Sequence, residues 1–179
     1  FILGMALALV LNTNIRFSRF IRSIMMIPWV VPTLISGLVW LWMFQPQYGL
    51  VKYFVGILSG GKITDFAILN SPTTAMLGVS VAALWKQIPL ATLLLLAGLA
   101  NVPEDMLEAA KIDGANEAQR FFKITLPLLS PTVFFVLVTR VIGALQVFDL
   151  VYMVMDISNP ALKKTESIVY LFYQYSFQN

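Results

Sequence analysis

Three long stretches with almost no charge limit the folds open to this chain more than any other feature. The stretch 23–51 has no charged residue, 70–100 has only Lys86, and 128–155 has only Arg140 and Asp149. A helix crosses the hydrocarbon core of a bilayer with about 20 predominantly apolar residues. Each stretch is long enough for one such helix, so we predict three membrane spans over these ranges.

Two shorter apolar stretches lie at the ends of the sequence. The residues 1–11 read as the tail of an earlier span, because the chain opens at Phe1 inside an apolar run. The stretch 165–177 is apolar and aromatic but too short to cross, so we expect it near the interface. We therefore expect an all-α, polytopic transmembrane bundle, present as a fragment that lacks terminal spans, with 1–179 as one transmembrane domain.

Composition supports a membrane protein over a very apolar soluble helical domain. The chain is 59% hydrophobic and 12% charged, with a mean hydropathy of +0.81, whereas soluble domains are about a quarter charged. It has no cysteine and no histidine, which excludes disulfides, thiolate metal sites and imidazole catalysis. We expect contact with membrane lipid, no metal site and no nucleic-acid partner, since a net charge of +3 is explained by basic loops.

Charge is concentrated in one segment, 104–123, between the second and third predicted spans. Pro103 suits the first turn of a helix, and Glu104 and Asp105 follow where the helix dipole favours anions. Gly114 ends this helix, because glycine tolerates the left-handed conformation found at many helix C-termini. A second short helix should follow and stop at Pro127. Taken alone, the segment is either a solvated connector or a docking element with a thin glycine corner.

The distribution of Lys and Arg predicts which side of the membrane this segment occupies. The loop before the first predicted span holds Arg16, Arg19 and Arg22, and Lys111, Arg120 and Lys123 fall on the same side. The opposite side has four lysines, at positions 52, 62, 163 and 164. Because basic loops stay in the cytoplasm, we expect 101–127 to be a cytoplasmic loop.

A phosphate-binding loop is excluded despite a suggestive spacing. The stretch Gly56 to Lys62 reads GILSGGK, which has the spacing G-x-x-x-x-G-K. The next residue is Ile63 rather than the Ser or Thr that would bind Mg²⁺, and no buried strand precedes the loop. We therefore expect this chain to bind no nucleotide or other cofactor itself.

The polar segment is similar to the signature loop of the binding-protein-dependent ABC importer permeases. Its pattern is E-A-A, three residues, G, nine residues, then I-x-L-P, and every spacing is met here. The surrounding stretches RFIRSIMMIPWVVPTLISGLVW, LWKQIPLATLLLLAGL and IGALQVFDLVYMV resemble the sugar-transporting, maltose-permease-like subgroup of that family. The resemblance covers nearly the whole chain, and relative to the family the first span or more is missing at the front and the last span is missing at the back.

The resemblance implies a role for the loop and for its partners. The helix around Glu108 would dock on a cytoplasmic ATPase subunit, which binds ATP and Mg²⁺, and the loop would transmit the movement to the spans. A second homologous permease and an extracytoplasmic solute-binding protein are the other implied partners, in the inner membrane of a prokaryote. The chain itself would not be an enzyme. The implied coupling residues are Glu108, Ala109, Ala110, Asp113, Gly114, Ile124, Leu126 and Pro127.

Lys86 and Arg140 are cations inside predicted spans, which is costly in a membrane and marks either a polar path or a buried contact. Both lie about halfway along their predicted spans. The family pattern places the solute path at Lys86, Gln87, Leu90, Arg140, Ala144 and Val147. Contacts to sugar hydroxyls or phosphate are one interpretation of the two cations; bonds or snorkelling that merely hold the helices are the other. A secondary carrier or channel with a passive connector remains the alternative function.

Overall fold

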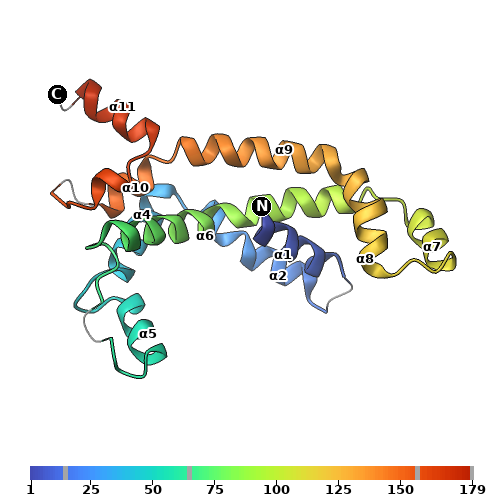
Figure 1. Ribbon diagram of the computed structural model, residues 1–179, viewed down its shortest axis with the longest axis horizontal. Helices are drawn as coiled ribbons and strands as arrows, with labels where there is room; N and C mark the ends of the chain where they lie inside the picture. Colours follow the sequence, from blue (N-terminus) through green and yellow to red (C-terminus); the bar gives the residue numbers. More distant parts are fainter. Residues whose placement is uncertain (14–15, 64–65, 156–157, 178–179) are drawn as a thin grey trace. The chain divides into compact units, whose positions relative to one another are not determined.

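The computed structural model describes residues 1–13, 16–63, 66–155 and 158–177, and within these ranges it contains helices and no strand. The helices are α1 (Ile2–Asn12), α2 (Ser18–Met25), α3 (Ile27–Val30), α4 (Thr33–Met43), α5 (Leu50–Leu58), α6 (Pro72–Leu99), α7 (Glu104–Ile112), α8 (Glu117–Arg120), α9 (Leu126–Leu145), α10 (Asp149–Val154) and α11 (Ile168–Phe177). A π-helical segment, Phe121–Thr125, joins α8 to α9, and a short 3₁₀ turn, Leu162–Lys164, precedes α11. The all-α fold is thus confirmed (Figure 1).

The chain forms two compact units. Unit 1 comprises Phe1–Ile27 and Ile88–Ile142, and unit 2 comprises Pro28–Gln87 and Gly143–Asn179. The long helices α6 and α9 contribute to both, α6 passing from unit 2 to unit 1 after Gln87 and α9 passing back after Ile142. The loop 101–127 lies entirely within unit 1.

Unit 1 has an aliphatic core between α1, the second half of α6 and α9. Its buried residues are Met5, Ala8, Leu11, Ala91, Leu95, Leu96, Leu99, Leu129 and Val136. Gly98 brings α6 and α9 close together: a Cβ there would lie 2.5 Å from Leu129 Cδ1 and 2.9 Å from Thr132 Oγ1. Close packing at a glycine fixes the two helices that carry the polar loop.

Unit 2 has a more aromatic core around α4, the first half of α6 and α10. Its buried residues include Trp40, Phe44, Ala75, Val79, Ala82, Leu150, Val151, Val154 and Tyr170. Gly37 in α4 faces Met153 in α10, where a Cβ would lie 2.6 Å from the Met153 Cβ. The α4–α10 contact therefore depends on the absence of a side chain at position 37.

Two of the predicted spans correspond to helices that are long and apolar enough to cross a membrane, Pro72–Leu99 and Glu117–Leu145. The second predicted span, 70–100, is confirmed almost to the residue. The third, 128–155, is wrong at both ends. Its helix begins before Leu126, because the π-helical segment carries α8 into α9, and it ends at Leu145, ten residues early.

Two further expectations are corrected by the same helix. Pro127 does not stop the helix that starts at α8: the Leu126 N–H bonds to the Phe121 carbonyl in the wider π pattern, so the chain passes the proline without ending. Arg140 lies in the last two turns of α9 rather than halfway along a span, since that helix ends at Leu145. Lys86, by contrast, is at the middle of α6, as predicted.

The first predicted span, 23–51, is not one continuous helix. The helix breaks at Val31 and Pro32, restarts at Thr33 and ends at Met43. Proline has no N–H to donate to the carbonyl four residues earlier, so Pro32 leaves the Pro28 carbonyl without its helical partner. The helical segments Ser18–Val30 and Thr33–Met43 are bent by 92° at this break and form at most one membrane span.

Candidate functional site

The polar loop begins with α7, which is exposed over most of its length. Glu108 and Ala109 are exposed, Ala110 is half-buried, and Ile112 at the end of the helix is 86% exposed. Glu104 and Asp105 occupy the first turn and Lys111 the last, as the helix dipole favours. Figure 1 shows α7 and α8 projecting past the ends of α6 and α9 that they join. The loop therefore presents an apolar tip on an otherwise charged helix.

The glycine corner is a Schellman motif, in which a left-handed residue closes the end of a helix with two backbone bonds. Gly114 has φ +81°. Its N–H donates to the Lys111 carbonyl at 3.1 Å, and the Ala115 N–H donates to the Ala110 carbonyl at 2.9 Å. The predicted end of the helix at Asp113 and Gly114 is confirmed, and the second alanine of the E-A-A motif proves to be the acceptor that closes the turn.

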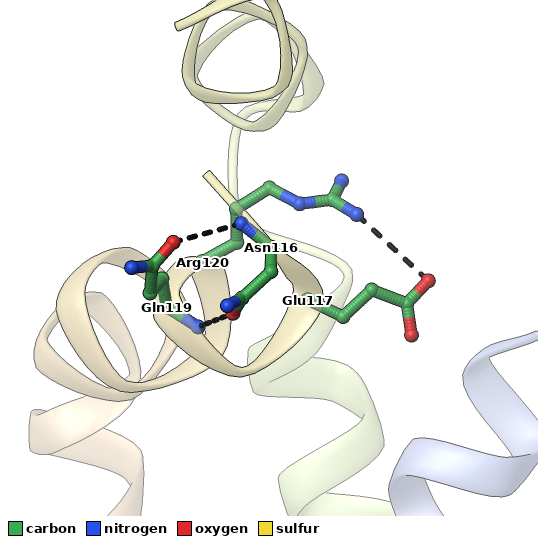
Figure 2. Close-up of polar contacts among 4 residues, drawn as sticks. All are labelled: Asn116, Glu117, Gln119 and Arg120. Carbon is green, nitrogen blue, oxygen red and sulfur yellow. Dashed lines mark hydrogen bonds and ion pairs between the residues drawn. The ribbon is translucent and has the colours of Figure 1, made fainter. Parts of the chain in front are cut away.

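The next helix, α8, starts with a capping box (Figure 2). The Gln119 N–H donates to Asn116 Oδ1 at 2.8 Å, and the Asn116 N–H donates to Gln119 Oε1 at 2.9 Å. Glu117 and Arg120 form an ion pair at 3.8 Å, with Glu117 almost fully exposed. This reciprocal cap satisfies two donors at the helix start and fixes the direction in which α8 leaves the glycine corner.

The last part of the motif anchors the loop rather than extending it. Thr125 is buried, Ile124 is half-buried, and Leu126 packs against the core of unit 1. Pro127 is exposed on the outer face of the continuous helix. The eight residues assigned to coupling therefore divide in two: Glu108 to Gly114 form the exposed tip, and Ile124 to Pro127 join that tip to α9.

The six residues assigned to the solute path are divided between the two units. Lys86, Gln87, Ala144 and Val147 belong to unit 2, and Leu90 and Arg140 belong to unit 1. Within unit 2, Gln87 Oε1 lies 3.8 Å from the position of a Cβ on Gly143, next to Ala144. Val147 follows the end of α9 and packs against the core. Unit 2 thus places Gln87 beside the turn of α9 that carries Ala144.

The two cations differ in their contacts. The Lys86 Nζ donates to the backbone carbonyls of Val31, at 2.5 Å, and Pro28, at 3.5 Å. Arg140 is half-buried, and its buried Nε contacts no acceptor among the described residues. These contacts favour the interpretation that Lys86 holds the helices together. Arg140 is the cation that retains an unpaired hydrogen-bond donor, its Nε–H.

Sequence reasoning missed the acceptors of Lys86, although the signal was present. Pro28 and Pro32 are four residues apart, which is the spacing between a carbonyl and the N–H that it accepts in an α-helix. A proline at the second position therefore predicts an unpaired carbonyl at the first. Lys86, the one charged residue of the next apolar stretch, is able to donate to it.

In the described part of the chain, no group of His, Cys, Asp or Glu could hold a metal ion.

Long apolar helices joined by an exposed polar loop are the architecture of a multi-pass membrane protein. A crystal structure of a bacterial alginate ABC transporter, in complex with an alginate pentasaccharide-bound periplasmic protein, has the same fold, with a TM-score of 0.82 at 21% identity; the match covers 98% of this chain and 60% of that one. The whole chain, residues 1–179, matches the family of binding-protein-dependent transport system inner membrane components, and it belongs to that family.

Two relatives illustrate the family. The trehalose/maltose transport system permease protein MalF of Thermococcus litoralis is 44% identical over 151 residues, which cover 84% of this chain and 50% of the relative. The sn-glycerol-3-phosphate transport system permease protein UgpA of Agrobacterium fabrum is 39% identical, over 99% of this chain and 60% of the relative. The chain thus spans about half to three fifths of their length. The predicted family, transport class and inner-membrane location are confirmed.

Proposed function

We propose that this chain belongs to the membrane-spanning permease subunit of an ATP-driven importer for sugars or sugar-like solutes. An extracytoplasmic solute-binding protein would deliver the solute, and a second homologous permease would complete the path through the lipid bilayer. Support comes from the family and from the relatives, whose names specify trehalose/maltose and glycerol 3-phosphate transport. The chain belongs to a transport family, and its proposed role is to move a solute across the membrane rather than to catalyse a chemical reaction.

The observation that carries this proposal is the loop 101–127. It has an exposed tip with the E-A-A and glycine positions in a closed Schellman turn, and a base packed into the core of unit 1. We propose that this cytoplasmic loop docks on a partner ATPase subunit, which binds ATP and Mg²⁺, while this chain holds no cofactor of its own. Force applied to α7 would pass through the capped α8 directly into the spanning helix α9, because the helix is continuous from Glu117 to Leu145.

The solute path is proposed along Gln87, Leu90, Arg140, Ala144 and Val147. A Gln amide and an Arg guanidinium supply the donors that sugar hydroxyls and phosphate oxygens accept. The side chains at positions 90, 144 and 147 are small or apolar and offer no competing polar group. Among these residues, Arg140 is the strongest polar candidate, since its buried Nε has no acceptor within the described part of the chain.

The test compares two exposed apolar residues at helix ends. Ile112, at the tip of the loop, and Leu58, at the end of α5, are each 86% exposed. The distribution of Lys and Arg predicts that they lie on opposite sides of the membrane. In the complete transporter, Ile112→Ser is expected to reduce co-purification of the ATPase subunit and ATP-driven uptake. Leu58→Ser, the matched control, should leave the ATPase bound. If ATPase association and uptake both survive Ile112→Ser and the charge-introducing Ile112→Asp, the loop is a connector and a carrier or channel becomes the better assignment.

A further inference from the structure

The break between α3 and α4 leaves backbone carbonyls that the helix cannot satisfy. In a continuous helix the Pro28 carbonyl would accept from the N–H of residue 32, but Pro32 has none. The Val31 carbonyl also lies at the break, where the helix has ended. Inside a bilayer, an unsatisfied carbonyl has no water to bond with and is costly. Something must therefore donate to these two oxygens.

Lys86 is the donor. Its Nζ bonds to the Val31 and Pro28 carbonyls from the middle of α6, more than 50 residues away in sequence. The Pro32 carbonyl is satisfied separately, by the backbone N–H and the Oγ of Ser36. An ammonium also suits the C-terminal end of α3, where the helix dipole is negative. The lysine thus bonds closely to the Val31 carbonyl at the break, reaches the Pro28 carbonyl that proline leaves unpaired, and adds a favourable charge.

The packing of unit 2 holds Lys86 in this position. Ala75, Val79 and Ala82 are the buried residues of α6 in the core, and Lys86 continues their spacing of three or four residues along one helix face. The neighbouring Trp85 meets Trp40 of α4 edge to face, with ring centroids 5.9 Å apart. The helix face of α6 that packs in the core of unit 2 therefore continues to Lys86, whose ammonium contacts the break between α3 and α4.

From these contacts we infer that Lys86 is a positioning residue that holds the break at Pro28–Pro32 in its bent form, and that it does not bind the solute. The inference concerns the folding of unit 2 and stands whether or not the proposed transport function is correct. It predicts that Lys86 and Pro32 depend on each other: the lysine is needed because residue 32 is proline.

A double-mutant cycle tests this dependence through thermal stability of the purified, complete transporter. Lys86→Met is expected to lower the Tm, since it leaves the half-buried Val31 and Pro28 carbonyls unpaired, whereas Lys86→Arg should retain most of the stability. Adding Pro32→Ala supplies an N–H to the Pro28 carbonyl, so the double variant should recover stability relative to Lys86→Met. Thr92→Val is the matched control: it removes a buried hydroxyl that bonds only within α6, to the Ile88 carbonyl at 3.0 Å.

The outcomes are distinguishable even if one variant fails to fold. When Lys86→Met yields no folded protein, recovery of folded protein in the double variant supports the inference and its absence overturns it. Uptake kinetics in proteoliposomes give the second readout. A positioning role predicts that Lys86→Met reduces maximal uptake about tenfold at unchanged KM, since the loss of one charged hydrogen bond would lower the population of the bent form by about that factor. A raised KM with normal maximal rate, regardless of residue 32, would show that Lys86 contacts the solute.

Discussion

Replacing Gly114 with alanine is expected to loosen the tip of the polar loop by a definable amount. The residue has φ +81°, and no heavy atom lies within 4 Å of the position that a Cβ would take. The cost is therefore the backbone term alone, about 1–2 kcal/mol for a left-handed L-residue. That corresponds to a 5–30-fold loss in the population of the closed turn. Gly114→Asn should behave nearly as the native protein, because asparagine tolerates this conformation.

Gly60 provides the matched control, because α5 ends in the same motif. The Gly60 φ is +61°, no heavy atom lies within 4 Å of its Cβ position, and the Gly61 N–H donates to the Gly56 carbonyl at 2.9 Å. Hydrogen exchange should accelerate 5–30-fold at the Ala115 amide in Gly114→Ala and at the Gly61 amide in Gly60→Ala. ATP-driven uptake should fall only in the first. Unchanged exchange at Ala115 would refute the conformational reasoning; equal loss of uptake in both variants would refute the assignment of coupling to this loop.

Three further changes test the site and its support. Asn116→Ala removes the α8 cap at a cost of about 1 kcal/mol, so the Gln119 amide should exchange about fivefold faster, while Asn116→Asp should not change it. Gly98→Ala places a Cβ 2.5 Å from Leu129 Cδ1 and should destabilise the fold by about 1–3 kcal/mol, measured as a lower Tm. Gly143→Ala, where the nearest atom to the new Cβ is 3.8 Å away, should leave the Tm unchanged. Arg140→Gln should raise the uptake KM at least tenfold if its guanidinium binds solute, since a charged hydrogen bond contributes about 1.5–3 kcal/mol; an unchanged KM removes it from the path.

The sequence predicted the helices whose position and ends are determined by residues within or next to them. The helix α6 follows from one long apolar stretch, and the α7 boundaries follow from Pro103, the acidic first turn and Gly114. The concentration of charge in 104–123 singled out the loop, and the spacing of its seven motif positions gave the family resemblance. These features depend on neighbours in sequence, and a single sequence contains that information.

The expectations that failed depend on partners elsewhere in the fold. A proline in an apolar stretch can be carried through the helix, as at Pro127 and at Pro89 within α6, or can break it, as at Pro32. Pro127 directly follows a π-helical turn closed by the Leu126 N–H and the Phe121 carbonyl, whereas at Pro32 the freed carbonyl is reached by a lysine from a distant helix. Likewise, the three residues that follow Leu145 at the end of α9 include no proline, glycine or charged residue, so composition extended that span too far.

The π-helical segment before α9 sets the rotational phase of the loop. A π turn contains one residue more than the α turn it replaces, so it offsets everything before it by about 100° around the helix axis. In a helix that continues from α8 into α9, one residue between Phe121 and Thr125 therefore decides which way the α7 tip faces. Deleting Phe122 or Lys123 would keep the helix continuous and leave the residues of both parts of the motif unchanged. The α7 tip would nevertheless rotate about the helix axis, away from the proposed ATPase contact.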